Sequence, residues 1–328
     1  MSQYKLIAFD MDGTLLDSDK KIRQDSIDMI HAAADAGKIV CLSTGRCMAE
    51  LKEYMEQLSV LQYIIGASGA FVFDVKNNRE LSSTPLPVET VRCMMQKVKD
   101  MDLMMQMLSE HSIVQKDKVR HMEDYQMGIY KPLFESIALQ PDDLYAFYEQ
   151  NPIPLYKLNL YCKNPEERAL LRERFAPLGL VLVNAETTSL ECSAPHVSKG
   201  QGLRELCEYL HISMEQTIAV GDADNDLDIL KQAGLAVAMG NANENVKNIA
   251  DVTGNEFDVD MSNNHDEASV NVAKAADLAI VKTKSAKEVI YAINATQQLN
   301  SDMAYSLRRS LIEKRIDCRG VYAPAILV

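Results

Sequence analysis

The sequence predicts an α/β protein with a Rossmann-like core, in which a parallel sheet carries helices on both faces, and with an inserted α+β domain. The first observation is that short apolar runs, beginning with residues 6–9, alternate with helical patterns as in βαβ units. The second is that this alternation changes at about Pro85 and resumes at about Ser189. The third is the length of 328 residues, which exceeds the usual size of one hydrophobic core. We therefore expect two domains.

The composition is that of an ordinary globular protein, with 47% hydrophobic and 25% charged residues. The formal net charge of -13 argues against a surface for nucleic acid or anionic membrane, which needs clustered lysine and arginine. The 7 cysteines are scattered without a Cys-x-x-Cys pair, so neither a disulfide framework nor a zinc site is indicated. No apolar run reaches the ~18 residues that a membrane span needs. We expect a cytoplasmic protein with no nucleic-acid and no membrane partner, and the oligomeric state is left open.

Two acids follow the first predicted strand, in the segment Asp10-Met11-Asp12-Gly13-Thr14. The carboxyl edge of an open α/β sheet is where ligands bind, and Gly13 lets backbone approach a ligand closely. Repulsion between neighbouring carboxylates pushes their pKa values apart, which gives one acid and one base near neutral pH. One acid is then a candidate nucleophile and the other a candidate proton donor. A solvated turn after a strand is the alternative.

A second predicted strand, residues 39–42, delivers Ser43-Thr44-Gly45-Arg46 to the start of a predicted helix over residues 48–58. The unpaired N–H groups and positive dipole end of a helix N-terminus suit an anion. Thr44 is therefore a candidate phosphate contact, and its alternative role is a helix cap. The other elements predicted before residue 85 are a helix over residues 25–36 and a strand from Ile64.

The inserted segment, residues 85–188, is predicted to form the separate α+β domain. Its methionines cluster between residues 94 and 107, where core packing is favoured over an adaptable substrate wall. Glu110-His111 stands between two strand-like runs and is predicted to form a solvated hairpin tip. The predicted helices span residues 88–99, 142–150 and 165–175, and the predicted strands 103–108, 113–114, 156–161 and 181–183.

The α/β pattern resumes with a predicted strand over residues 189–192 and a helix over residues 203–210. Lys199 precedes that helix, where a solvated charge is the plain alternative to a ligand. A strand over residues 217–220 then ends in Gly221-Asp222-Ala223-Asp224-Asn225-Asp226, which repeats the layout of the opening motif. A calcium loop of the EF-hand type is excluded, because leucine and alanine stand where it requires glycine and glutamate. The βαβ unit is completed by a helix over residues 227–233 and a strand over residues 236–239.

Four ordered segments resemble the motifs of the haloacid dehalogenase superfamily. They are Asp10-x-Asp12-Gly13-Thr14, Ser43-Thr44-Gly45-Arg46, Val197-Ser198-Lys199-Gly200 and Gly221-Asp222-x-x-Asn225-Asp226. An insertion between the second and third motifs is similar to that of the Cof-type subfamily of phosphatases. The resemblance covers roughly residues 4–252. It implies a core domain (1–84 and 189–294) and a cap domain (85–188), and the remaining residues form a C-terminal extension (295–328).

By this resemblance, Asp10 is the nucleophile that accepts the phosphoryl group as an aspartyl phosphate. Asp12 protonates the leaving oxygen and then activates water. A covalent intermediate divides one difficult step into two easier ones. The residues implied to bind the phosphate are Thr44, Gly45, Lys199 and Asn225.

The resemblance also implies Mg²⁺ as the cofactor. Its implied ligands are Asp10, the backbone carbonyl of Asp12, and Asp222. Asp226 and Asn225 are implied to orient the metal's water, the lysine or the phosphate. A cation is physically reasonable here, because a carboxylate and a phosphate dianion repel each other unless positive charge intervenes.

The implied activity is that of a Mg²⁺-dependent phosphatase acting on a small soluble phosphomonoester, such as a sugar phosphate or a phosphorylated cofactor. A phosphomutase of the same superfamily is the second hypothesis, although no dense cluster of arginine and lysine in residues 85–188 suggests a site for a second phosphate. A non-catalytic phosphate-binding protein is the third. It is disfavoured because the acids of the motifs and Lys199 are all present.

Two features depart from the Cof-type pattern. Ser68-Gly69-Ala70 stands where the family usually has Asn-Gly-Ala, so a polar contact near the cap hinge or the substrate is expected to differ. The sequence also continues well beyond the expected last helix of the core. It includes a polar, acidic stretch over residues 253–270 that is predicted to be a surface loop.

Overall fold

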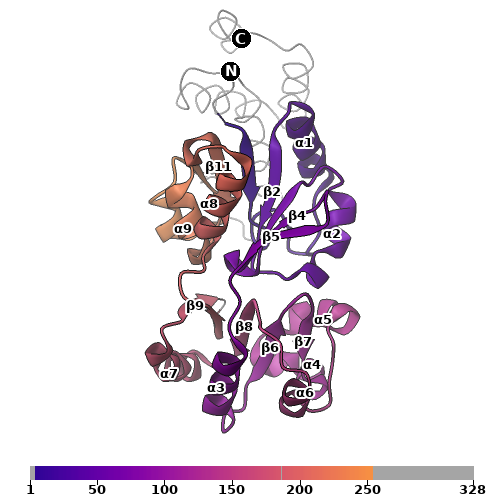
Figure 1. Cartoon of the computed structure of the whole chain (residues 1–328), viewed down its shortest axis with the longest axis vertical. Helices are drawn as coiled ribbons and strands as arrows, with labels where there is room; N and C mark the ends of the chain where they lie inside the picture. Colours follow the sequence, from indigo (N-terminus) through magenta and orange to yellow (C-terminus); the bar gives the residue numbers. More distant parts are fainter. Residues whose placement is uncertain (1–3, 186, 254–328) are drawn as a thin grey trace, which may run out of the picture. The chain divides into compact units, whose positions relative to one another are not determined.

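The computed structural model describes residues 4–185 and 187–253 (Figure 1). These residues divide into two compact units, one made of residues 4–42, 57–63 and 206–253 and the other of residues 43–56 and 64–205. Apart from Thr253, the predicted loop over residues 253–270 lies outside the described residues, as does the predicted extension over residues 295–328.

The larger sheet has the strand order β13-β12-β11-β1-β2-β3-β4-β5. β1 runs parallel to both of its neighbours, β11 and β2, whereas β4 and β5 form an antiparallel hairpin. The predicted α/β class with a mainly parallel sheet is confirmed. The strands are β1 (Leu6–Phe9), β2 (Ile39–Ser43), β3 (Tyr63–Gly66), β4 (Phe71–Asp74), β5 (Arg79–Ser83), β11 (Thr217–Gly221), β12 (Leu235–Ala238) and β13 (Val252–Thr253).

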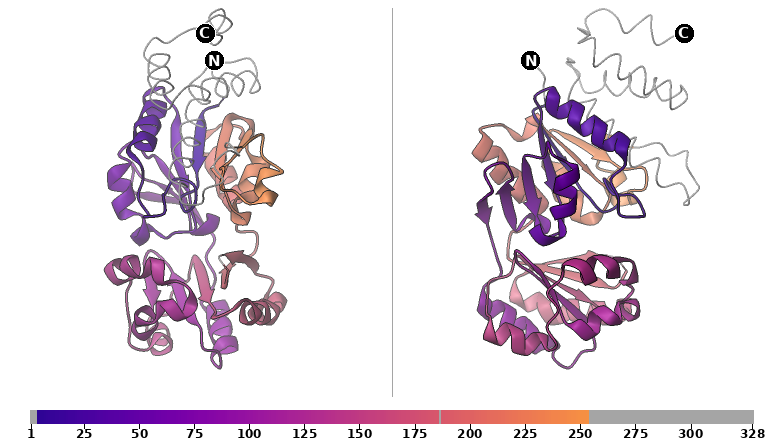
Figure 2. Two further views of the ribbon diagram at one scale, coloured as in Figure 1. Left: turned by 180° about the vertical axis from the view of Figure 1, so that it is seen from behind. Right: turned by 90° about the vertical axis from the view of Figure 1, so that its right-hand side faces the viewer.

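Helices cover both faces of the part of this sheet that lies in the first unit (Figure 2). The strand order explains this arrangement. The chain moves across the sheet in one direction from β1 to β2 and in the opposite direction from β11 to β12. Right-handed crossovers then place α1 (Gln24–Asp35) and α9 (Leu227–Gln232) on opposite faces. Every residue of β1 is buried, as a strand covered on both sides requires.

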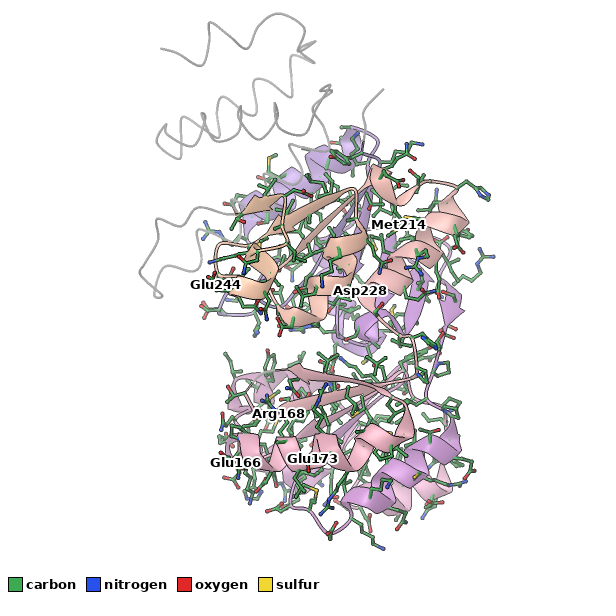
Figure 3. The ribbon with its side chains drawn as sticks, turned by 90° about the vertical axis from the view of Figure 1, so that its left-hand side faces the viewer. Glu166, Arg168, Glu173, Met214, Asp228 and Glu244 are labelled. Carbon is green, nitrogen blue, oxygen red and sulfur yellow. The ribbon has the colours of Figure 1, made fainter. Side chains whose placement is uncertain are left out.

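The smaller sheet has the order β7-β6-β8-β10-β9, and neighbouring strands are antiparallel. Leu158, Leu160 and Leu190 are fully buried. They share the face along which α7 (Pro165–Phe175) runs, where Glu166, Arg168 and Glu173 mark the helix in Figure 3. The strands are β6 (Met104–Leu108), β7 (Ser112–Val114), β8 (Lys157–Tyr161), β9 (Val181–Ala185) and β10 (Ser189–Ser193). The remaining helices are α2 (Lys52–Gln57), α3 (Val88–Val98), α4 (Lys116–Arg120), α5 (Lys131–Ile137), α6 (Leu144–Gln150), α8 (Lys199–Leu210) and α10 (Glu244–Lys247).

Two expectations for the inserted segment are confirmed. Except for the half-buried Met101, the clustered methionines belong to the core, and Met94, Met104 and Met107 are fully buried. β6 and β7 form an antiparallel hairpin, with Glu110-His111 exposed at its tip. Among the described residues, no helix combines the length and the apolar composition needed to cross a membrane.

Other expectations need correction. The strand predicted over residues 189–192 is present, but it lies between β8 and β9 in the smaller sheet instead of opening the returning core. The alternation of residue types identifies a strand without specifying the sheet that it joins. In place of one helix over residues 48–58, the chain forms a short 3-10 turn at Met48–Glu50 followed by α2. The core and cap boundaries at residues 84 and 188 stay a prediction, because the two compact units are defined by contacts and follow other boundaries.

Candidate active site

Three acids from two neighbouring strands meet in the first unit. Asp10 follows β1 directly, and Asp222 and Asp226 follow β11. One carboxylate oxygen from each of these acids lies within 4.8 Å of the other two. Because β1 and β11 are parallel neighbours with Phe9 opposite Val220, their carboxyl ends meet at one edge of the sheet. Acids more than two hundred residues apart in the sequence are thus brought together.

Local hydrogen bonds fix the geometry of this acid cluster. Thr14 donates from its hydroxyl to Oδ1 of Asp222 over 3.0 Å. Asp226 is fully buried, and its Oδ2 accepts from the backbone N–H groups of Asp222 and Ala223 at 3.1 and 3.2 Å. Gly13 has a left-handed φ of 84°, and a Cβ at this position would collide with the Asp222 carboxylate. A glycine is therefore required for the close approach of the two loops.

The donor set of the cluster fits a magnesium ion. Three carboxylates at this spacing repel one another, and their hard oxygen atoms are ligands that Mg²⁺ prefers. The side-chain oxygen of Asn225, next to Asp226, is buried and has no hydrogen-bond partner among the described residues. A buried acceptor of this kind suits a water or ligand that donates to it.

Asp12 lies outside the carboxylate cluster and pairs with Lys20. The distance between Asp12 Oδ1 and Lys20 Nζ is 2.9 Å, and both side chains are partly exposed. Lys20 adopts a left-handed φ of 59° in a turn that brings it back toward the motif. Lys20 could not be identified from the sequence, because a left-handed lysine in a polar turn leaves no signal in residue spacing.

Thr44 and Lys199 lie in the second unit and border the same turn. The backbone carbonyl of Thr44 accepts from the N–H of Ser68 over 2.9 Å. Gly69 lies so close to the backbone of Ser198 and Lys199 that a Cβ there would overlap it. Lys199 is buried as the first residue of α8, which begins four residues earlier than predicted. The Thr44 hydroxyl also accepts from the N–H of Arg46, as expected of a turn or cap residue.

The turn that Thr44 and Lys199 border is unusual, because Ala67, Ser68 and Gly69 all have positive φ values of 46°, 61° and 99°. Left-handed non-glycine residues occur mainly where surrounding contacts enforce them. Ser68 uses its hydroxyl to donate to Glu191 Oε2 over 3.0 Å and to accept from Lys157 Nζ over 3.2 Å. A changed polar contact was expected at Ser68, but its two partners could not be identified from the sequence, since each is a single charged residue within a strand pattern.

A buried carboxylate lies near this turn, on the 3-10 turn that follows Arg46. Burial raises the pKa of Glu50 above its ordinary value, and the nearby Arg46 guanidinium acts in the opposite direction. Glu50 accepts from the Gln106 side chain over 2.7 Å and from the Cys47 N–H over 3.3 Å. Hydrogen bonds therefore connect the loop after β2 to the smaller sheet within the second unit.

The comparisons with known proteins assign the family. The family model of haloacid dehalogenase-like hydrolases matches residues 7–260. The chain is 28% identical to phosphatase YwpJ of Bacillus subtilis, over 75% of this chain and 93% of that protein. It is also 28% identical to the 5-amino-6-(5-phospho-D-ribitylamino)uracil phosphatase YcsE of Bacillus subtilis, over 75% and 88% of the two chains.

Solved structures support the same assignment. A haloacid dehalogenase-like hydrolase from Bacillus subtilis has a TM-score of 0.68 and 27% identity, covering 76% of this chain and 94% of that one. A haloacid dehalogenase-like hydrolase from Bacteroides thetaiotaomicron has a TM-score of 0.70 at 22% identity. The match covers 84% of this chain and 98% of that one and shows that the two share a fold. The chain belongs to the haloacid dehalogenase-like hydrolases, as the resemblance to that superfamily predicted, and its curated relatives named above are phosphatases.

Proposed function

We propose that this protein is a Mg²⁺-dependent phosphatase that hydrolyses a small soluble phosphomonoester through an aspartyl phosphate on Asp10. The observation that carries the proposal is the convergence of the Asp10, Asp222 and Asp226 carboxylates within 4.8 Å of one another. The matching family and its named phosphatases support the same reaction class. Within this proposal, the smaller sheet and its helices form the cap.

Asp10, Asp222 and the backbone carbonyl of Asp12 would hold the ion, and Asp226 would orient its water. Bound Mg²⁺ supplies positive charge that offsets repulsion between the Asp10 carboxylate and the phosphate dianion. The hydrogen bonds from the Thr14 hydroxyl to Asp222, and from two N–H groups to Asp226, keep these acids in place without the ion.

The proposed reaction has two steps. A carboxylate oxygen of Asp10 attacks phosphorus, the ester O–P bond breaks, and Asp12 gives its proton to the leaving alcohol oxygen. A water that Asp12 deprotonates then attacks phosphorus and breaks the Asp10 O–P bond, releasing phosphate. Lys20, 2.9 Å from Asp12, orients the carboxylate for the second step, in which Asp12 takes a proton from water. The phosphate is held by Thr44, Gly45, Lys199 and Asn225.

The test is release of inorganic phosphate from a broad panel of phosphomonoesters, with Mg²⁺ and with a chelator. We expect turnover of at least one sugar or cofactor phosphate that disappears with the chelator and returns when Mg²⁺ is restored. Exchange of phosphate between positions of a sugar without net release would favour the phosphomutase. Failure to act on any ester would favour the non-catalytic phosphate-binding protein.

A further inference from the structure

The loop between β12 and α10, residues 239–243, lies against both segments that carry the acid cluster. In the larger sheet, β12 is the neighbour of β11 and β11 is the neighbour of β1, and both pairs are parallel. The carboxyl ends of the three strands therefore meet at one edge of the sheet. Glu244, the first residue of α10, marks the end of this loop in Figure 3. The loop supplies no acid of its own, so its part in the site is to contact the segments that do.

Asn241 joins this loop to the segment after β1. Its side-chain N–H donates to the carbonyl oxygen of Gly13 over 2.9 Å. The N–H of the same peptide group, which belongs to Thr14, donates to the carbonyl of Met11 over 3.2 Å. Because both polar atoms of this peptide group are hydrogen-bonded, its orientation is fixed. Thr14 is the residue whose hydroxyl holds the Asp222 carboxylate, so Asn241 acts on a metal ligand through it.

The backbone of the same loop holds the segment after β11. The N–H of Asn243 donates to the carbonyl of Asp222 over 3.1 Å. The N–H of that peptide group, which belongs to Ala223, donates to the Asp226 carboxylate over 3.2 Å. The loop therefore bonds to both acid-bearing segments, and the Asn241 side chain supplies the bond to the first of them.

The acid cluster depends on contacts of this kind, because three carboxylates with oxygen atoms within 4.8 Å of one another repel. Asn241 is exposed, so its hydrogen bond contributes only modestly to the stability of the fold. Its effect on a bound ion is larger, since groups that hold metal ligands in place typically change metal affinity by about 10- to 100-fold. Mg²⁺ is the more sensitive ion, because it demands near-ideal octahedral geometry, whereas Ca²⁺ accepts flexible arrangements and longer bonds.

We infer that Asn241 is a positioning residue of the proposed metal site, which holds the segments after β1 and β11 together and so sets the preference for Mg²⁺ over Ca²⁺. This inference rests on the proposed function, in which Asp10, Asp222 and the Asp12 carbonyl hold the ion. Without the Asn241 side chain, the peptide group after Gly13 is free to rotate and the carboxylates can move apart. A larger ion tolerates that change and Mg²⁺ does not.

The experiment measures the dissociation constants of Mg²⁺ and of Ca²⁺ by calorimetric titration of the whole chain, after metal has been removed with a chelator and without substrate. In Asn241→Ala, we expect the Kd for Mg²⁺ to rise by about 10- to 100-fold. The Kd for Ca²⁺ should rise by less than about 3-fold, because its coordination is more flexible. The ratio of the two constants is the decisive quantity, since a change in overall charge attraction affects both divalent ions alike.

A second variant of the same size gives an independent measurement. Asn241→Asp places an ionised carboxylate, which cannot donate, opposite the Gly13 carbonyl. Its added charge attracts both ions and cancels in the ratio of the constants. The preference for Mg²⁺ should therefore fall as it does in the alanine variant.

Two controls separate positioning from other effects. Asn248 is an exposed asparagine just after α10, and Asn248→Ala should leave both constants at their wild-type values. Asn164→Ala removes the N-cap of α7 in the other unit, where the Asn164 side chain accepts from the N–H of Glu167. It should lower the melting temperature and keep the wild-type ion preference, because the loss of a cap lowers stability without touching the acids.

The remaining outcomes distinguish this inference from the proposed function. An unchanged Kd for Mg²⁺ in Asn241→Ala, or an equal rise for both ions, overturns the positioning role and leaves the metal site intact. The same loss of preference in Asn164→Ala also overturns it, because reduced stability would then explain the effect. Wild-type protein that binds neither ion overturns the proposed Mg²⁺ site, and the role of Asn241 with it, whereas release of phosphate from the ester panel tests the phosphatase separately.

Discussion

Gly13 illustrates, at the scale of single residues, how a backbone position controls the acid cluster. It combines a left-handed φ with a contact to the Asp222 carboxylate that leaves no room for a side chain. Asp222 is in turn held by the Thr14 hydroxyl. Any side chain at position 13 therefore strains the backbone and displaces a proposed metal ligand.

The first prediction compares two glycines with nearly equal φ. Gly13→Ala should destabilise the protein by about 1–3 kcal/mol and weaken the stabilisation that added Mg²⁺ produces. Gly37→Ala is the control, because its φ is 81° but an added Cβ would meet nothing within 4 Å. Urea unfolding with and without Mg²⁺ measures both effects. Equal losses in the two variants would show that the contact with Asp222 is unimportant.

The second prediction concerns the charge of Asp10. Asp10→Asn should lower kcat by at least about 10⁴-fold, because a neutral amide is a far weaker nucleophile. Without metal it should raise the melting temperature, since one of three mutually repelling carboxylates is removed. Asp19→Asn, an exposed acid in the following loop, should change neither quantity. Near wild-type turnover in Asp10→Asn would remove this residue from the proposed mechanism.

At the scale of elements, hydrogen bonds tie Asp102, just before β6, to three other segments. The carboxylate accepts from Lys118 in the middle of α4, from Lys163 after β8, and from the hydroxyl of Tyr125 on the 3-10 turn that follows α4. These hydrogen bonds, the one from Lys118 first, hold the pKa of Asp102 well below its usual range. They stabilise the ionised form, so Asp102 contributes to stability only where it carries its charge.

The third prediction follows from the direction of that pKa shift. A lowered folded-state pKa gives stability that is complete above the unfolded value of about 4 and is lost as the pH falls toward the folded value. Asp102→Asn should therefore cost about 1 kcal/mol at neutral pH, a modest value because solvent screens a partly exposed group. The difference from wild type should shrink below about pH 4. Urea unfolding midpoints of both proteins across the pH range measure this difference in stability. The control Asp100→Asn, which removes one ion pair with Arg174, should lower the stability by less. A stability difference between Asp102→Asn and wild type that does not change with pH would contradict the role assigned to Asp102.

Elements with strong local patterns could be predicted from sequence, and those set by tertiary contacts could not. The apolar run 217–220 and the helical pattern over residues 165–175 correspond closely to β11 and α7. The position of β10 depends on pairing with β8 and β9, which its own residues do not encode. The short helices between residues 116 and 137 lack a full apolar period and were not predicted.

The same division applies to the candidate site. Motif spacing led to Asp10, Asp222 and Asp226, because each follows a recognisable strand. Lys20 and Lys157 reach their partners through a left-handed turn and a register match. Neither feature is visible in a list of residue types, so both lysines were found only in the structure.

At the scale of the whole molecule, the net charge of -13 sets the long-range field that an anionic substrate meets. The fourth prediction is that kcat/KM for a dianionic ester, with saturating Mg²⁺, rises by about 2- to 10-fold as ionic strength increases from about 0.01 to 0.15 M. Salt screens the repulsion between protein and substrate, while kcat, which is measured with substrate already bound, should stay nearly constant. Stopped assays at several salt concentrations measure both. A fall in kcat/KM would mean that local positive charge at the site dominates the approach.

The pairing of β1 with β11 has a consequence for biosynthesis. Leu6 lies opposite Thr217, so one edge of the first strand has no partner until most of the described chain has left the ribosome. At translation rates of about 5–20 residues per second, the interval between completion of β2 and of β11 is roughly 10–40 s. During this time an apolar strand edge is open to pairing with other nascent chains, which makes the interval the period of greatest aggregation risk and the one in which a chaperone would be of most use.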